Sequence, residues 1–385
     1  MRKVCVVITS RASYSRFKTA LIEIKKHHAL ELQLVLAASA LLDRYGKIID
    51  TIKQDGFEVK REVYSIIDGE SLLSMAKTAG NGILELTSVF NDLKPDCVVT
   101  VADRYETMST AISASYMNIP LVHIQGGEIT GNIDEKVRHA ITKLADLHLV
   151  STEKAKERVI KMGEDPGSVI VTGCPSIDIA KEVSQSMEMD FDPIKKYGGV
   201  GSDIVIQPKK YVVMLQHPLT TAHEEAREHV TMSLEILKEL GHPTLVFWPN
   251  VDAGSDGTSK GIRTFREFGG ANNIRYYKNM YPSDFLKLLC NSMCLIGNSS
   301  VGIRECSYLG VPVVNIGDRQ RKRDRGRNVI DVKHDTKAIR TAIDQQIENG
   351  HYQQDHVYGD GNAGVKIAQA IADFDLTFDK VLSYN

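Results

Sequence analysis

The sequence contains neither a long apolar run nor an excess of charge of one sign. Lys and Arg number 47 against 49 Asp and Glu, which gives a formal net charge of -2 at pH 7. A chain this balanced has no basic excess with which to bind nucleic acid or an acidic membrane surface. Its longest apolar stretches, such as residues 4–8 and 34–42, are far shorter than the roughly 20 residues that span a bilayer. We therefore expect no nucleic acid and no membrane among its partners.

Several common motifs are also missing. The six cysteines include no CxxC pair and no Cys/His ligand spacing, so we expect no metal and reduced thiols in a cytoplasmic protein. The first residues, Met-Arg-Lys-Val-Cys-Val-Val-Ile, are typical of a buried strand, whereas a signal peptide needs a longer apolar stretch and a small-residue cleavage site. The dinucleotide pattern GxGxxG is absent after this strand.

What the sequence does contain is a repeated alternation of short β-branched runs and longer helical stretches. The predicted strands are 4–8, 32–37, 97–101, 120–124, 147–150 and 169–172, and then 211–215, 244–248, 274–277, 293–296 and 311–316. Continuous apolar strands separated by helices indicate parallel sheets covered on both faces. The length of 385 residues fits two domains at roughly 100–200 residues each. The prediction is an α/β protein with two Rossmann-like, doubly wound domains.

The domain boundaries are predicted at the glycine-rich connections. Gly173-Cys174-Pro175 follows the sixth strand and is a candidate hinge, so the domains are placed at 1–173 and 174–362. Residues 184–210 carry Gly-Gly-x-Gly and two prolines without periodicity, which predicts an irregular insertion. A helical pattern spans 363–382, and we expect the segment 363–385 to pack back on the first domain.

Ligands in open α/β sheets bind at the carboxyl ends of the strands, so the polar residues that follow each strand are the candidates for function. After the first strand come Arg11 and Ser15, beside a helix expected to begin near Ser15, and a helix N-terminus suits a phosphate. Asp103 and Arg104 follow the strand 97–101 and could serve proton transfer and phosphate binding. A plainer interpretation remains open for both pairs, namely an ordinary helix cap beside a solvated arginine.

The most informative stretch follows the strand 120–124. It holds Gln125, a glycine pair that lets the backbone approach another group closely, Glu128 and Asp134. A purely structural loop rarely needs this density of titratable groups. Part of it is still explained if Asp134 caps a helix, or if Arg138 pairs with Asp134 or Glu135 at helical spacing.

In the second series, each strand end again carries polar residues. His217, held by the following proline, is a candidate proton donor or phosphate contact. Asn298, Ser299 and Ser300 form a tight turn into a helix, which predicts a diphosphate cradle, and Glu305 suits a pair of ribose hydroxyls. The remaining candidates are Asn250 and Asp252, in a polar loop, and Arg319, at the start of a charge run that is otherwise expected to be solvated.

These strand-end strings together resemble the hydrolysing UDP-N-acetylglucosamine 2-epimerases of sialic-acid synthesis. The shared strings are Ser-Arg-Ala-Ser-Tyr-Ser, Ala-Asp-Arg-Tyr-Glu, Gly-Gly-Glu-x-Thr-Gly-x-Ile-Asp, Arg-His-Ala-Ile-Thr-Lys-Leu-Ala, Gln-His-Pro-x-Thr-Thr, Pro-Asn-x-Asp-Ala-Gly-Ser, Gly-Asn-Ser-Ser and Tyr-Gly-Asp-Gly-Asn. The resemblance implies a GT-B-like pair of domains with the nucleotide in the interdomain cleft. It also implies conversion of UDP-GlcNAc and water to UDP and ManNAc through a glycal, without metal or other cofactor, by a homodimer or homotetramer.

The resemblance assigns roles to individual positions. Asp103 and Asp134 match catalytic carboxylates, and His217 is expected near the diphosphate. The positions implied to bind the nucleotide are Arg11, Ser15, Arg104, Ser299, Ser300, Glu305 and Arg319. Where many members carry a catalytic Glu, this chain has Gln125, so either Glu128 takes over or the substrate differs.

That departure keeps several alternatives open. The alternative substrates are UDP-N,N'-diacetylbacillosamine and GDP-GlcNAc, as in legionaminic-acid synthesis. A catalytically inactive nucleotide-sugar-binding protein, a GT-B glycosyltransferase and a non-hydrolysing epimerase are the rivals from other classes.

Overall fold

The computed structural model describes residues 1–42, 48–68, 71–101, 104–130, 133–218, 225–249, 255–377 and 380–383. The chain forms two compact units. The first comprises Met1–Ile129, Ile133–Asp178 and Tyr358–Asn385, and the second is formed mainly by Ile179–Val357. The sequence had placed these changes of unit at 173 and 362, whereas the structure has them at 178 and 357.

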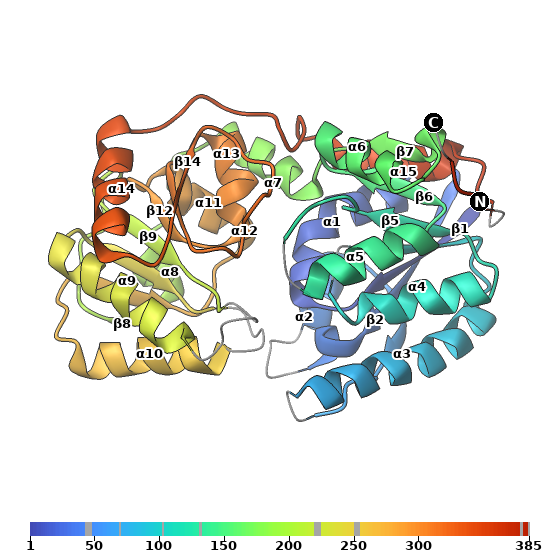
Figure 1. Ribbon diagram of the computed structural model, residues 1–385, viewed down its shortest axis with the longest axis horizontal. Helices are drawn as coiled ribbons and strands as arrows, with labels where there is room; N and C mark the ends of the chain where they lie inside the picture. The colour runs from blue at the N-terminus through green and yellow to red at the C-terminus, as the bar shows by residue number, and fades with distance from the viewer. Residues whose placement is uncertain are drawn as a thin grey trace. The chain divides into compact units, whose positions relative to one another are not determined.

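The first unit is a parallel sheet with helices on both faces (Figure 1). Its strands are β1 (Arg2–Ile8), β2 (Leu30–Ala37), β3 (Val59–Val63), β4 (Cys97–Val101), β5 (Leu121–Ile124), β6 (Leu147–Val150) and β7 (Val169–Val171). Its helices are α1 (Arg11–Lys26), α2 (Ile48–Gln54), α3 (Leu72–Leu93), α4 (Thr107–Tyr116), α5 (Ile133–Leu144), α6 (Glu153–Lys161), α7 (Pro175–Ser184), which runs into the second unit, and α15 (Ala363–Asp373).

The strand order in this sheet is β3-β2-β1-β4-β5-β6-β7. Alternate residues of β1 face opposite sides: Val4, Val6 and Ile8 pack with α1, α2 and α15, while Cys5 and Val7 pack with α3, α4 and α5. A strand buried on both faces needs the continuous apolar run seen in the sequence. The order reverses between β1 and β4, so the sheet has a switch point there.

The second unit repeats this plan with one antiparallel strand at an edge. Its strands are β8 (Val200–Gly201), β9 (Val212–Leu215), β10 (Thr244–Phe247), β11 (Ile274–Tyr277), β12 (Leu295–Gly297), β13 (Val313–Ile316) and β14 (Val329–Val332), in the order β14-β13-β12-β9-β10-β11-β8. Its helices are α8 (Pro193–Tyr197), α9 (Ala226–Leu240), α10 (Ser255–Phe268), α11 (Pro282–Cys290), α12 (Ser300–Ile303), α13 (Glu305–Leu309) and α14 (Thr336–Asn349). The switch point lies between β9 and β12.

The sequence predicted that the insertion 184–210 is irregular, but part of it has regular secondary structure. It contains the short helix α8 and the strand β8, which pairs antiparallel with β11. The side chain of Arg275, on β11, fixes this segment by donating to the carbonyls of Gly198, Gly199 and Ser202. The segment is thus held by the several donors of one arginine rather than by an apolar face. For that reason its sequence lacks the apolar periodicity from which a strand or helix is predicted.

Helix α15 packs on the first unit against α1. Gly364 makes the approach possible, because a Cβ there would lie 2.9 Å from the backbone of Thr19. The carboxylate of Asp178 caps the start of α15 by accepting from the N–H groups of Ala363 and Gly364, both at 2.8 Å. The helix ends at Asp373 rather than continuing to 382 as the sequence predicted.

Beyond α15, the chain enters a buried charge cluster in the first unit. The carboxylate of Glu164, only 2% exposed, contacts Lys143 at 2.6 Å, His148 at 3.0 Å and Lys380 at 2.5 Å. Burial raises the pKa of Glu164, but hydrogen bonds from these three partners outweigh it and lower the value to about 2. The cluster therefore ties Lys380, near the end of the chain, to β6 and α5.

Two further observations bear on the predicted class of protein. No helix in the described part of the chain is both long and apolar enough to cross a membrane. All six cysteines are buried, and burial raises the pKa of Cys290 to about 11, so that thiol stays protonated at neutral pH.

Candidate functional site

Most of the predicted site residues that the structure describes lie at the carboxyl ends of strands, in two groups. In the first unit they follow β1, β4 and β5, and in the second they follow β9, β12 and β13. β1 and β4, and β9 and β12, flank the switch point of their sheet, and β5 and β13 are the next strands along. Crevices for ligands form at the switch point in doubly wound folds. Three predicted residues, Asp103, Asn250 and Asp252, lie outside the described residues.

After β1, helix α1 begins at Arg11, four residues earlier than predicted. The reason is Ser10, whose backbone is extended and whose Oγ accepts from the N–H of Ser13 at 3.1 Å. Arg11 is exposed at the first position of the helix, and Ser15 lies half-buried one turn further on. Both remain close to the positive end of the helix dipole, as a phosphate contact requires.

After β4, Arg104 is held by a buried carboxylate. Its Nε and one terminal nitrogen each lie 3.2 Å from an oxygen of Glu106, whose side chain is only 2% exposed. A two-point contact of this kind fixes the plane of the guanidinium. Arg104 is therefore preorganised, with 30% of its side chain still exposed to a ligand.

After β5, the backbone makes a tight turn at residues 125–127, and this turn is closely packed against neighbouring residues. Gln125 has φ +65° and is 2% exposed, and its amide nitrogen donates to the sulfur of Cys174 at 3.0 Å. The glycine pair Gly126-Gly127 does allow the backbone to approach another group closely, as predicted, and the group is another part of the same chain. A Cβ on Gly127 would lie 2.4 Å from the carbonyl oxygen of Ala155, in α6, and one on Gly126 would lie 3.0 Å from Nδ1 of His123.

Helix α5 and the loop before it carry two candidate acids and a buried arginine. Asp134 lies half-buried in the first turn, and Glu128, just before the helix, is 2% exposed. Arg138, one turn after Asp134, is fully buried and donates to the carbonyl of Glu128 at 2.7 Å. Arg138 thus supports the turn that carries Glu128, whereas the sequence offered it only as a partner of Asp134 or Glu135.

The sequence interpretation named Arg138 but missed that it is fully buried and supports the turn of Glu128. A signal for it existed, because Arg138 shares the helical face of Ile141, Thr142 and Ala145, all of which are fully buried. A guanidinium on that face stays charged and needs several acceptors.

In the second unit, Asn298 holds His217. The side-chain oxygen of Asn298 accepts from the N–H of His217 at 2.7 Å, and its amide nitrogen donates to the carbonyl of His217 at 2.9 Å. The two strand ends are drawn together where Gly297 has φ +133°, since a Cβ there would lie 2.2 Å from the carbonyl oxygen of Leu215. The amide of Asn298, predicted to touch substrate, is engaged by the backbone of His217 and positions that residue.

We expect Asn298→Ala to destabilise the second unit by about 2–4 kcal/mol, because both backbone groups of buried His217 lose their partners. The same variant should bind UDP more weakly. Urea unfolding and UDP titration check the two effects. Asn291→Ala is the matched control: it removes an amide that donates to two backbone carbonyls, but at a half-buried site open to water, and should cost less than about 1 kcal/mol. Equal losses in both variants would contradict the assignment.

The turn after β12 has the predicted strand-turn-helix form. Ser299 is the N-cap of α12 and accepts from the N–H of Val301 at 3.4 Å, and Ser300 is the first residue of the helix. Both are half-buried. Glu305 begins the next helix, α13, after a break at Arg304. A hydroxyl pair followed by a carboxylate about one turn later is the arrangement expected for a diphosphate and a ribose.

Arg319, after β13, reaches the same turn. Its guanidinium donates to the carbonyl of Asn298 at 3.2 Å, beside Ser299. The charge run that follows is solvated only in part: Arg321 and Lys322 are exposed as predicted, whereas Gln320, Arg323 and Asp324 are all less than 9% exposed. Gln320 also donates to the carbonyl of Asn298, at 3.0 Å, so the run folds inward to support this strand end.

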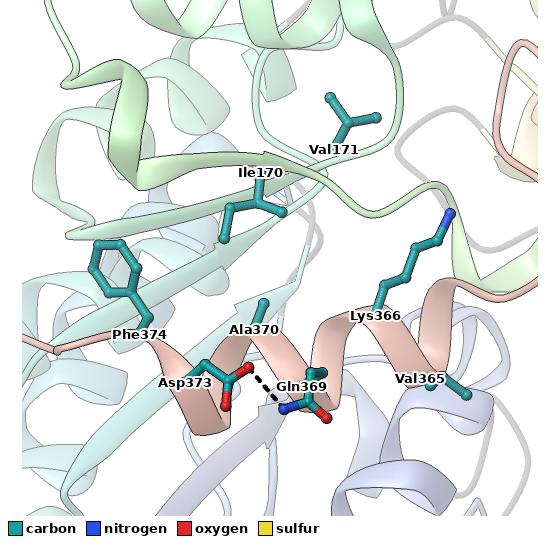
Figure 2. A pocket seen from close by; sticks show the side chains of 8 residues that line it. All are labelled: Ile170, Val171, Val365, Lys366, Gln369, Ala370, Asp373 and Phe374. Atoms are coloured by element: carbon teal, nitrogen blue, oxygen red, sulfur yellow. Dashed lines mark hydrogen bonds between the residues drawn. The ribbon is translucent and has the colours of Figure 1, made fainter.

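A separate groove lies on the first unit, away from all the predicted site residues. It measures about 510 Å³ and runs between α15 and the edge strand β7, and Figure 2 shows its side chains, with Gln369 donating to Asp373 at 2.7 Å. Among the described residues there is no cluster of three or more His, Cys, Asp or Glu side chains arranged to hold a metal ion.

We compared the sequence and the structure with those of known proteins. The family model described as UDP-N-acetylglucosamine 2-epimerase matches residues 22–372. The chain is 30% identical to UDP-N,N'-diacetylbacillosamine 2-epimerase (hydrolyzing) of Legionella pneumophila, over 96% of each chain. It is 32% identical to polysialic acid biosynthesis protein P7 of Escherichia coli, over 97% of this chain and 94% of the relative.

A solved structure agrees on the fold. UDP-GlcNAc 2-epimerase of Neisseria meningitidis, bound to UDP-GlcNAc, superposes with a TM-score of 0.78 at 21% identity, covering 96% of this chain and 99% of the other. The predicted GT-B-like class, with two Rossmann-like domains, is confirmed. Since the family model matches nearly the whole chain, this protein belongs to the UDP-N-acetylglucosamine 2-epimerase family.

Proposed function

We propose that this chain is a hydrolysing nucleotide-sugar 2-epimerase that converts UDP-GlcNAc and water to UDP and free ManNAc, for the synthesis of a sialic-type acid. One observation carries the proposal. In a chain of this family, acids and a fixed arginine gather at one switch point, and hydroxyls, a histidine and an arginine gather at the other. The first set suits proton transfer, and the second suits a departing diphosphate.

The chemistry explains why both sets are needed. Carbon 2 of an acetamido pyranose is not next to a carbonyl, so its proton is not acidic enough for direct removal. Elimination solves this problem: the C1–O bond to the diphosphate breaks, with the electron pair leaving on the diphosphate, while a base takes the proton from C2. The product is a glycal. Water then adds at C1, and C2 regains a proton on its other face.

The residues of the second unit would hold the leaving group. Ser299 and Ser300 offer hydroxyls and helix N–H groups, and Arg319 offers a guanidinium already placed beside Ser299. His217, fixed by Asn298, would contact the diphosphate, and Glu305 would accept from the ribose hydroxyls. Each donor stabilises charge that grows as the C1–O bond breaks.

The residues of the first unit would move the protons. We assign Asp134, with Asp103, to proton transfer at C2, while Arg11, Ser15 and Arg104 contact the phosphates. Glu128 is the candidate for the role that Gln125 cannot fill, because an amide does not exchange protons as a carboxylate does. Support for Glu128 is its place on the turn fixed by Arg138.

Gln125 also bears on the substrate. Relatives of this chain are named for UDP-N,N'-diacetylbacillosamine and for GDP/UDP-N,N'-diacetylbacillosamine, so a diacetylated sugar is the second candidate substrate. A nucleotide-sugar-binding protein without turnover is the second candidate function. The buried amide of Gln125, engaged with Cys174, is the observation that favours it.

One experiment separates these possibilities. The purified protein is incubated singly with UDP-GlcNAc, UDP-N,N'-diacetylbacillosamine and GDP-GlcNAc, and every product is identified. The proposal expects free nucleotide and a free 2-epimeric sugar in equal amounts, with UDP-GlcNAc the preferred substrate. Nucleotide still joined to an epimerised sugar would indicate a non-hydrolysing epimerase, and binding without products would indicate the binding protein.

We further propose that the protein is a cytoplasmic homo-oligomer, a dimer or a tetramer. Support comes from large apolar side chains on helices α3 and α4, where Leu73, Leu84 and Tyr116 are 66%, 71% and 86% exposed. Sedimentation equilibrium tests this directly, and a monomer at micromolar concentration would refute it.

A further inference from the structure

Beside His217 lies a small cavity that the proposed mechanism does not use. It measures about 10 Å³, and its lining is mostly polar, with Gln216, His217, His229, Thr258, Asn298 and His334 together with Pro218 and Ala226. This volume corresponds to about one water molecule, and a buried water needs two to four polar partners. The cavity meets both conditions.

His334 lies in the chain just after strand β14. Its ring is packed from two sides. It stacks on His229, from α9, with ring centroids 3.5 Å apart and an interplanar angle of 4°. On another side it lies against Gly317, where a Cβ would come within 2.6 Å of the Nε2 of His334. Only a glycine, here with φ +76°, leaves room for the imidazole in this place.

Both nitrogens of His334 are buried and have no hydrogen-bond partner among the described residues. A buried donor or acceptor without a partner costs about 1–3 kcal/mol. Such groups are usually satisfied by ordered water when the protein offers nothing else. The cavity that His334 shares with His217 is where such a water fits.

Burial keeps His334 neutral at neutral pH. Burial and the neighbouring His229 lower its pKa to about 4, against the opposing effect of Asp318 in the loop after β13. His229 in turn lies 3.4 Å from Glu225, and Asp335, the residue after His334, caps α14. At neutral pH, His334 therefore has one nitrogen that donates and one that accepts.

We propose that one water molecule occupies this cavity and joins His334 to His217, which makes His334 a positioning residue for His217. The water fixes the tautomer and the plane of the His217 ring, while Asn298 fixes its backbone. The consequence for catalysis rests on the proposed role of His217, but the water bridge itself does not. Its tests therefore use substrate-free protein.

The first test is the titration of His217 by NMR in the wild type and in His334→Phe. Phenylalanine keeps the ring stacked on His229 but offers the water no partner. We expect the pKa of His217 to fall by about 0.5–1 unit, because a buried imidazolium loses a polar neighbour. His334→Gln, which can still bond the water, should restore the wild-type value.

His28→Phe is the matched control, because His28 also stacks on a histidine, His27, at 4.9 Å, but in the first unit. It should leave the titration of His217 unchanged. An unchanged titration in His334→Phe, or an equal shift in His28→Phe, would overturn the proposal.

The second test needs no variant. A crystal structure of the unliganded protein at high resolution should show an ordered water within hydrogen-bond distance of both rings. Clear density for the rings without that water would overturn the proposal. Release of UDP by the wild type is measured separately, so failure of the bridge and failure of the proposed function give different results.

Discussion

Asp134→Asn is expected to lower the rate of UDP release by about 10²–10⁴-fold, the range that a positioned general base contributes. The amide has nearly the shape of the carboxylate but cannot take the proton from C2. Binding of UDP should stay near the wild-type level, because Asp134 is assigned to proton transfer and makes none of the proposed nucleotide contacts. The expected pattern is thus a loss in kcat with little change in affinity.

The adjacent acid provides a matched control for this prediction. Glu135 shares the first turn of α5 with Asp134, but its carboxylate lies 3.4 Å from His139 at helical spacing. Glu135→Gln should keep turnover within a few-fold of the wild type. Asp103→Asn should behave as Asp134→Asn does. Near wild-type turnover in both aspartate variants would remove these acids from the mechanism.

Glu164→Gln is expected to lower the free energy of unfolding of the first unit by about 1–3 kcal/mol, because three donors lose the buried carboxylate that accepts from them while the two lysines stay partly exposed to water. The carboxylate contacts Lys143, Lys380 and His148 at once, so its removal leaves ammonium groups without a counter-charge. Glu157→Gln, at an exposed position on α6, should change stability by less than about 0.5 kcal/mol. Chemical denaturation followed by a probe in the first unit compares the two variants, and equal stability would contradict this prediction.

The same cluster predicts how stability depends on pH. The folded pKa of Glu164, about 2, lies below its ordinary value of 4.5, so its contribution is present above pH 4.5 and is lost as pH falls toward 2. Burial likewise lowers the pKa of His148, so stability also falls as the pH drops below about 6.5, where the unfolded histidine takes up a proton. In Glu164→Gln, the loss between pH 4.5 and 2 should shrink, which acid titration of the variant measures.

The central strands could be predicted from the sequence because burial on both faces demands unbroken apolar runs. The strands that the prediction missed, β3, β8 and β14, all lie at sheet edges. β3 reads Val-Lys-Arg-Glu-Val and β14 carries Asp331, because an edge strand exposes side chains that a central strand must bury. The pattern that identifies a strand is therefore weakest where the sheet ends.

Some features of the candidate site could likewise be predicted from the sequence, and others could not. Residues that follow a strand directly, such as His217, Ser299 and Arg319, could be placed from local order alone. The role of Asn298 could not, because its partner His217 is 81 residues away in the chain. The same holds for the contact between Gln125 and Cys174, which spans 49 residues. Spacing in sequence carries no information about which distant backbone group an amide will meet.

The most direct test of the proposed reaction is turnover of UDP-GlcNAc in heavy water. Elimination followed by hydration removes the original hydrogen at C2 and replaces it from solvent. NMR and mass spectrometry of the released sugar should therefore show free ManNAc with one deuterium at C2, in step with the UDP formed. Released sugar that keeps its original hydrogen at C2 would contradict the elimination route and the assignment of acids to that carbon.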